Sequence, residues 1–214
     1  GFCLVGSEMC IRDRKYAQHF SIDTANGFQV IDVIDPASGK SAEFVLVPKG
    51  MEAPKGQDII YTPVQDWSLF SASFVGFLNE LEALHEVKYV ENAAYIYNEE
   101  VHAQLDAGEI QESGLFGQLD LEKIILDAPE LMVVNSIHDS SNELAKLTKA
   151  GVAIFPVVEW QENHPLARAE WIKVFGALLD EEAKADSVFN EIEKNYLEVQ
   201  KSCASGTHKV KVLF

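Results

Sequence analysis

The sequence is poor in basic residues. Its 214 residues include 17 Lys or Arg and 34 Asp or Glu, which gives a formal net charge of -17 at pH 7. So acidic a chain repels phosphate backbones, and this excludes sequence-independent binding to nucleic acid. The sequence also lacks an apolar run near the roughly 18 residues that a membrane-spanning helix needs. Its apolar content of 47% is nevertheless sufficient for the core of a globular fold.

Motifs of the common nucleotide and hydrolase sites are missing. No G-x-G-x-x-G follows an expected strand, and neither a G-x-x-x-x-G-K-[ST] loop nor a G-x-S-x-G nucleophile turn occurs. The cysteines are few, and Cys3, Cys10 and Cys203 form neither a fully paired disulfide framework nor a close metal-ligand spacing. These absences remove the usual dinucleotide, P-loop and hydrolase functions.

The two ends of the sequence differ from the rest. Residues 1–14 (GFCLVGSEMCIRDR) have no amphipathic period and resemble a translated sequencing adapter, so we interpret them as a non-native artefact. A degenerate signal peptide is the alternative, but Met9 before Cys10 does not fit a lipoprotein cleavage box. Residues 208–214 (HKVKVLF) begin a strand with no partner after it, and we therefore expect the native chain to continue.

Between these ends, strand and helix patterns alternate. Residues 15–57 form an N-terminal extension in which 27–34 and 43–48 are expected to make a β-hairpin. Residues 58–180 alternate short apolar strands with helices, which is typical of an α/β lobe with a mostly parallel sheet. The expected strands are 58–64, 87–91, 130–136 and 152–159. Residues 181–204 keep one apolar stripe over about six turns, which predicts a single long helix.

Aromatic and amide side chains follow the expected strands. In an open parallel sheet, ligands bind beyond the carboxyl ends of the strands, so these loops are the first candidates for a site. Such side chains suit a large, partly aromatic ligand held by stacking and a few hydrogen bonds. Each residue alone also fits a loop that seals the core, so the hypothesis rests on their clustering. The candidate ligand-binding residues are Trp67, Ser68, Tyr95, Tyr97, Asn135, His138, Glu159, Trp160 and Arg168.

Histidines and carboxylates in two of these loops leave a metal-dependent α/β enzyme open as an alternative. His138 precedes Asp139, and His164 lies near Glu159 and Glu162 in the sequence. Imidazole together with carboxylate suits zinc or iron. Because solvated loop residues need no metal, we assign no metal site and no catalytic residue.

Three phrases follow one another in a characteristic order: DLEKIILDAPELMVV, LAKLTKAGVAIFPV and HPLARAEWIKVFGALLDEEAKADSVFNEIEKNY. In this order they resemble the periplasmic substrate-binding proteins of ABC importers for cobalamin and ferric siderophores. The resemblance covers about residues 58–214, and only the combined order is specific. Glu130 in place of the usual Asp and Ala153 in place of Pro are mild departures.

The resemblance implies two α/β lobes joined by one long rigid helix. Residues 58–180 would be the Rossmann-like N-terminal lobe, 181–204 the interlobe helix, and 208–214 the start of a second lobe that this chain lacks. The resemblance further implies a monomeric protein that is not an enzyme. Such a protein lies in the periplasm and is lipid-anchored at the membrane surface. It captures a ferric siderophore, haem or cobalamin and delivers it to an ABC permease, so iron or cobalt belongs to the ligand and no resident cofactor is expected.

The resemblance also implies one permease contact. Members of the family dock through one surface Glu on each lobe, and the Asp-Leu-Glu motif carries the first of these to Glu122. The role of Arg168 stays open, because it can meet a ligand carboxylate bidentately or pair structurally with Glu159, Glu162 or Glu170. A ligand-sensing domain of a signalling receptor is a further alternative to transport.

Overall fold

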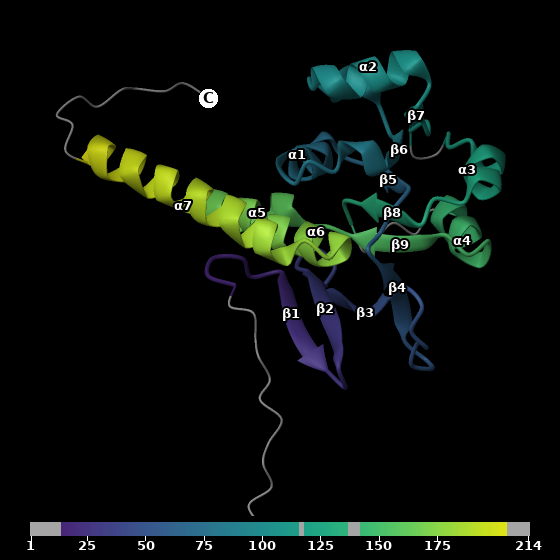
Figure 1. Cartoon of the computed structure of the whole chain (residues 1–214), viewed down its shortest axis with the longest axis horizontal. Coiled ribbons are helices and arrows are strands. Elements are labelled where there is room, and N and C mark those ends of the chain that lie inside the picture. Colours follow the sequence, from purple (N-terminus) through teal and green to yellow (C-terminus); the bar gives the residue numbers. More distant parts are fainter. Residues whose placement is uncertain (1–13, 116–117, 137–141, 205–214) are drawn as a thin grey trace, which may run out of the picture.

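The computed structural model describes residues 14–115, 118–136 and 142–204. Two sheets lie next to each other, and a long C-terminal helix runs out from them (Figure 1). The interpretations of residues 1–14, apart from Arg14, and of residues 208–214 lie outside the described residues. Within the described ranges, no helix has both the length and the apolar character needed to cross a bilayer.

The first sheet has four strands in chain order. They are β1 (Phe20–Ala25), β2 (Phe28–Asp35), β3 (Lys40–Pro48) and β4 (Asp58–Thr62). β2 pairs antiparallel with both β1 and β3, and the β2–β3 hairpin surrounds the turn that the sequence indicates. β4 pairs parallel with β3.

The position of β4 corrects the expectation that 58–64 begins the main parallel sheet. Ile60 and Thr62 are buried on one face of β4, whereas Tyr61 on the other face is exposed, so that face meets solvent. Strands of a parallel sheet covered on both faces are apolar throughout. A short β-rich run does not reveal which sheet it will join, and this is why the sequence misplaced it.

The second sheet is parallel and has five strands in the order β7-β6-β5-β8-β9. The strands are β5 (Trp67–Leu69), β6 (Val87–Val90), β7 (Gln111–Glu112), β8 (Leu131–Val134) and β9 (Ala153–Pro156). The chain moves from β5 outward to β7 and then returns to β8 on the other side of β5. The connections after β5 and β8 therefore diverge, which makes this the topological switch point where α/β sheets bind ligands.

Seven helices and three 3₁₀ turns are described. They are α1 (Ala72–Glu80), η1 (Leu84–Glu86), η2 (Ala93–Tyr95), α2 (Glu99–Ala107), α3 (Leu121–Asp127), α4 (Asn142–Lys149), η3 (Glu159–Gln161), α5 (Pro165–Glu170), α6 (Ile172–Leu179) and α7 (Glu182–Ala204). The long helix expected over 181–204 is confirmed as α7, which has 23 residues. Its last buried residue is Phe189, so most of α7 extends beyond the core of the lobe (Figure 1).

Two buried carboxylates hold the segment before β1 against the helices. The Glu170 carboxylate is fully buried and accepts hydrogen bonds from the backbone N–H groups of residues 15–17 at 2.7 to 2.8 Å. Glu162 Oε1 accepts from the N–H groups of residues 18 and 19 at 2.9 and 3.0 Å. Because this segment leads directly into β1, these bonds tie the first sheet to α5 and η3.

We therefore expect Glu170→Ala to destabilise the fold strongly. The change leaves three backbone donors without their acceptor, which costs about 3 kcal/mol of the free energy of unfolding. Glu191→Ala, at an exposed position of α7, is the control and changes that free energy by less than about 0.5 kcal/mol. Urea unfolding followed by tryptophan fluorescence measures both, and equal stabilities would show that the carboxylate is no anchor.

Candidate functional site

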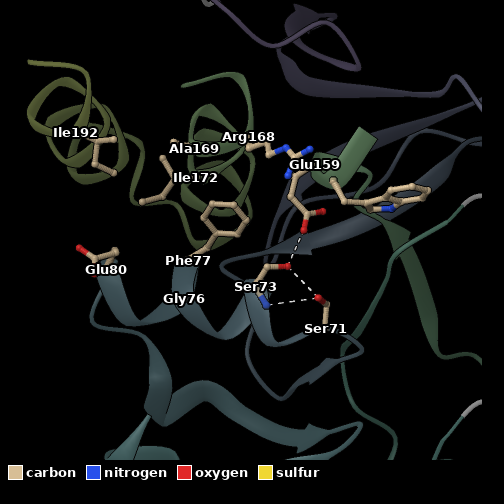
Figure 2. Close-up of a pocket in the computed structure, with 11 residues that line it drawn as sticks. Ser71, Ser73, Gly76, Phe77, Glu80, Glu159, Arg168, Ala169, Ile172 and Ile192 are labelled. Atoms are coloured by element: carbon tan, nitrogen blue, oxygen red, sulfur yellow. Dashed lines mark hydrogen bonds between the residues drawn. The ribbon is translucent and has the colours of Figure 1, made fainter. Parts of the chain in front are cut away.

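A cavity of about 610 Å³ lies between α1, η3, α5, α6 and α7 (Figure 2). At one end its wall is polar, with Ser71, Ser73, Glu159 and Arg168 close together. The other end is mainly apolar, with Phe77, Ile172 and Ile192 from three helices, and it also carries the carboxylate Glu80. Because α1 follows β5 and η3 follows β9, the polar end lies at the carboxyl edge of the parallel sheet.

The two serines are placed by the start of α1. Ser71 is the N-cap residue, and its Oγ accepts a hydrogen bond from the Ser73 N–H at 3.4 Å. The two hydroxyl oxygens are 2.9 Å apart. Ser73 Oγ in turn donates to Glu159 Oε1 at 2.6 Å, which links α1 to η3 across the cavity wall.

Glu159 has an unusual electrostatic environment for a loop carboxylate. Its residue surface is 7% exposed, and its Oε2 is buried without a hydrogen-bond partner among the described residues. Burial raises the pKa of Glu159 above its ordinary value. The hydrogen bond from Ser73, the backbone N–H groups of Glu159 and Trp160, and the charge of Arg168 lower the pKa in part, without offsetting the burial.

Arg168 is held by one bond from the base of its guanidinium group. Its Nε donates to the backbone carbonyl of Glu162 at 3.1 Å, while the side chain is exposed. No ion pair within 4.0 Å joins it to Glu159, Glu162 or Glu170, all of which are described. Instead, Glu162 and Glu170 bind the N-terminal segment, so the structural bridge considered for Arg168 is not formed.

Trp160 joins the loops after β8 and β9. Its indole Nε1 donates to the backbone carbonyl of Asn135 at 2.9 Å, and 52% of the residue surface remains exposed. The structure thus brings Asn135, Glu159 and Trp160 to one edge of the sheet, with Arg168 on α5 beside them. Asn135 contributes its main chain to this arrangement.

Tyr95 and Tyr97 lie at the same edge but farther along it. They follow β6 and are 69% and 92% exposed. Two strands, β5 and β8, separate β6 from β9, so about three strand spacings of roughly 4.8 Å divide the tyrosines from Trp160. Neither tyrosine lines the large cavity.

Trp67 and Ser68 are corrections to the expected ligand loop. Both are fully buried within β5, and the Trp67 indole stacks on Phe175 with ring centroids 5.7 Å apart. Its Nε1 donates to the backbone carbonyl of Val64 at 3.0 Å. Residues 58–64 were interpreted as the strand before this loop, and the true strand, β5, has three residues and is too short to show an alternating pattern. Trp67 and Ser68 were therefore interpreted as loop residues although they belong to the core.

Sequence reasoning missed most of the cavity wall. Ser71 carried a usable signal, because a serine directly before an apolar helical period is a common N-cap. Phe77, Ile172 and Ile192 carried none, since they belong to helices far apart in the chain and look like ordinary core positions.

The possible metal ligands are dispersed or occupied. His138 lies outside the described residues. His164 Nδ1 accepts from the Leu166 N–H at 3.1 Å and caps α5, while Glu162 binds the N-terminal segment. Across the parts of the chain that the structure describes, no group of three His, Cys, Asp or Glu side chains is arranged to hold a metal ion.

Glu122 is exposed in the first turn of α3. Asp120 caps this helix by accepting a hydrogen bond from the Lys123 N–H at 3.2 Å. Because α3 connects β7 to β8, its N-terminus lies at the carboxyl edge of the sheet. Glu122 therefore shares that edge with the candidate ligand loops.

Comparison with known proteins identifies related sequences. Residues 72–214 match the model of a family described as periplasmic binding protein. An uncharacterized lipoprotein of Methanocaldococcus jannaschii is 31% identical over 103 residues, which cover 48% of this chain and 25% of that protein.

Solved structures show the same fold at low identity. A possible iron-binding periplasmic solute-binding protein of Staphylococcus epidermidis has a TM-score of 0.55 and 18% identity, covering 70% of this chain and 55% of that one. A petrobactin-binding protein of Bacillus subtilis has a TM-score of 0.54 and 15% identity, covering 80% of this chain and 53% of that one. The chain thus spans about half the length of these structures and a quarter of the curated relative.

Proposed function

This chain belongs to the periplasmic binding protein family, and on that premise we propose that it binds an iron chelate outside the cytoplasmic membrane for delivery to an ABC permease. The ligand would be a ferric siderophore or haem, with cobalamin as a further chelate of the same kind. The printed descriptions of the Staphylococcus and Bacillus proteins, iron-binding and petrobactin-binding, support this choice. The lipoprotein relative supports a lipid anchor at the membrane surface.

The observation that carries the proposal is a fixed cation beside a fixed aromatic ring. The bond from Arg168 Nε to the Glu162 carbonyl orients the guanidinium group and leaves its terminal nitrogens for an anionic ligand. The bond from Trp160 to the Asn135 carbonyl likewise fixes an indole face that is half exposed. Siderophores and haem combine anionic oxygens with planar or aromatic parts, which this pair suits.

The dimensions also fit a large ligand. About 610 Å³ lies within the range of roughly 300 to 1,000 Å³ that small-molecule sites occupy. Tyr95 and Tyr97 extend the aromatic edge beyond the cavity, and a ligand that reaches them must span several strands. We propose that both tyrosines contact the outer part of the chelate.

Tryptophan fluorescence should report ligand binding through Trp160, because Trp67 and Trp171 are fully buried. Titration with haemin, ferric petrobactin and cyanocobalamin should quench the signal with at least one of them. Arg168→Gln should weaken that binding about tenfold or more, since a charged hydrogen bond is lost. Trp160→Ala should weaken it about fivefold when binding is measured by calorimetry.

Lys55→Gln, at an exposed position outside the cavity wall, is the control for lost positive charge and should bind like the unaltered protein. If no chelate binds, the proposed function is wrong. If the Arg168 and Lys55 variants bind equally well, the ligand does not use the cavity.

We also propose that Glu122 contacts the permease. Its exposure at the carboxyl edge lets an approaching partner reach it without entering the cavity. An exposed carboxylate outside a pocket influences association through long-range charge and not through ligand contacts.

Glu122→Arg should therefore leave chelate affinity unchanged and slow uptake into vesicles that hold the permease, because the reversed charge repels the partner. Glu109→Arg is the matched control, since Glu109 is exposed and precedes β7 at the opposite edge of the sheet. Equal uptake by the two variants, or loss of chelate binding in Glu122→Arg, would argue against docking at this residue.

A further inference from the structure

Glu159 is a buried carboxylate that chelate binding by Arg168 and Trp160 leaves unused. Its side chain reaches the polar end of the cavity wall, where Oε1 accepts the bond from Ser73 and Oε2 has no partner among the described residues (Figure 2). A buried carboxylate normally accepts several hydrogen bonds or pairs with a cation. Glu159 has neither arrangement in full.

The serine pair lets this carboxyl group exist in either protonation state. When Glu159 is ionised, Ser73 Oγ donates to it at 2.6 Å. When Glu159 is protonated, it can donate to Ser73, and Ser73 can then donate to Ser71, because either hydroxyl of that 2.9 Å pair can be the donor. A change of protonation therefore keeps the two hydroxyl hydrogen bonds that link Glu159, Ser73 and Ser71.

The charges that face Glu159 are few. From α1, the uncharged Ser71 and Ser73 lie next to it, and the carboxylate Glu80 lies farther along the same helix. From α5 comes Arg168, the one cation among the residues that line this cavity. The lining residues Ile172 of α6 and Ile192 of α7 are apolar. The ionised Glu159 and an anionic ligand consequently compete for electrostatic interaction with the positive charge of Arg168.

We propose that capture of an anionic chelate in this cavity is coupled to the uptake of one proton by Glu159. The inference rests on the proposed function and adds its regulation. An ionised Glu159 offsets the charge of Arg168 and repels the ligand, whereas a protonated Glu159 leaves that charge for the ligand. Affinity therefore rises as the pH falls through the pKa of the carboxyl group, and it declines as the pH increases.

Affinity should change at a higher pH than the titration of an exposed glutamate would give, because burial raises the pKa of Glu159. Removing the Ser73 hydroxyl should move it still higher, since that hydrogen bond favours the ionised form.

Calorimetric titration of haemin and ferric petrobactin, from about pH 5 to 8 in buffers of different ionisation enthalpy, measures affinity and proton uptake together. For the unaltered chain we expect uptake approaching one proton and affinity that falls up to tenfold per pH unit. Glu159→Gln should remove this part of the pH dependence and bind at every pH as tightly as the unaltered chain does at low pH. Protons exchanged by the probes themselves remain in the variant and are subtracted.

Ser73→Ala gives an independent measurement, because it keeps Glu159 and should shift the midpoint of the pH dependence upward. Ser187→Ala, at an exposed position of α7, is its control and should leave the midpoint in place. If neither probe binds at any pH, the proposed function fails and the coupling with it. If a probe binds but the Glu159→Gln variant takes up as many protons as the unaltered chain, or if Ser73→Ala leaves the midpoint unchanged, the coupling is wrong while the proposed function stands.

Discussion

The central strand β5 is the constraint on which the rest of the site depends. Its three residues are fully or almost fully buried, and it pairs with β6 on one side and β8 on the other. Because the chain continues from it directly into the cap of α1, the position of β5 fixes the two serines of the cavity wall. The return of the chain to β8 and β9 then brings the second half of the wall, Glu159 and Trp160, to the same edge.

Three glutamates close together in the sequence show how burial separates structural from functional carboxylates. Glu162 and Glu170 are buried, and backbone N–H groups of the N-terminal segment satisfy them. These two tie the segment before β1 to α5 and η3, and they are buried away from the cavity. Glu159 is buried as well, but it receives one hydroxyl hydrogen bond and keeps an oxygen without a partner in the described chain. A carboxyl group in that condition is free to respond to a ligand or to a proton.

Much of the fold was predictable because long periodic segments dominate it. The apolar runs of β6, β8 and β9 and the stripe of α7 identified a parallel α/β lobe with a long C-terminal helix. β5 was missed because a strand of three residues is too short to show an alternating pattern. β4 was assigned to the wrong sheet because the sequence of a strand does not specify which strand it pairs with, here β3.

The candidate site was predictable to the extent that it depends on strand ends. Reading the residues after each expected strand placed Asn135, Glu159 and Trp160 at one edge of the sheet, where the structure also has them, and their binding of a ligand stays a prediction. The same approach failed for Trp67 because it was applied to the wrong strand. Contacts between distant helices, such as that of Phe77 in α1 with Phe175 in α6, arise from packing, and no local sequence pattern predicts them.

The most direct test of the account is the location of bound iron. A crystal of the protein with ferric petrobactin or haemin, measured at the iron absorption edge, gives an anomalous peak at the metal. The account predicts that peak at the carboxyl edge of the parallel sheet, with an anionic group of the chelate on Arg168 and its planar part against Trp160. A peak at the opposite edge of the sheet, or a bound chelate that contacts neither residue, would contradict it.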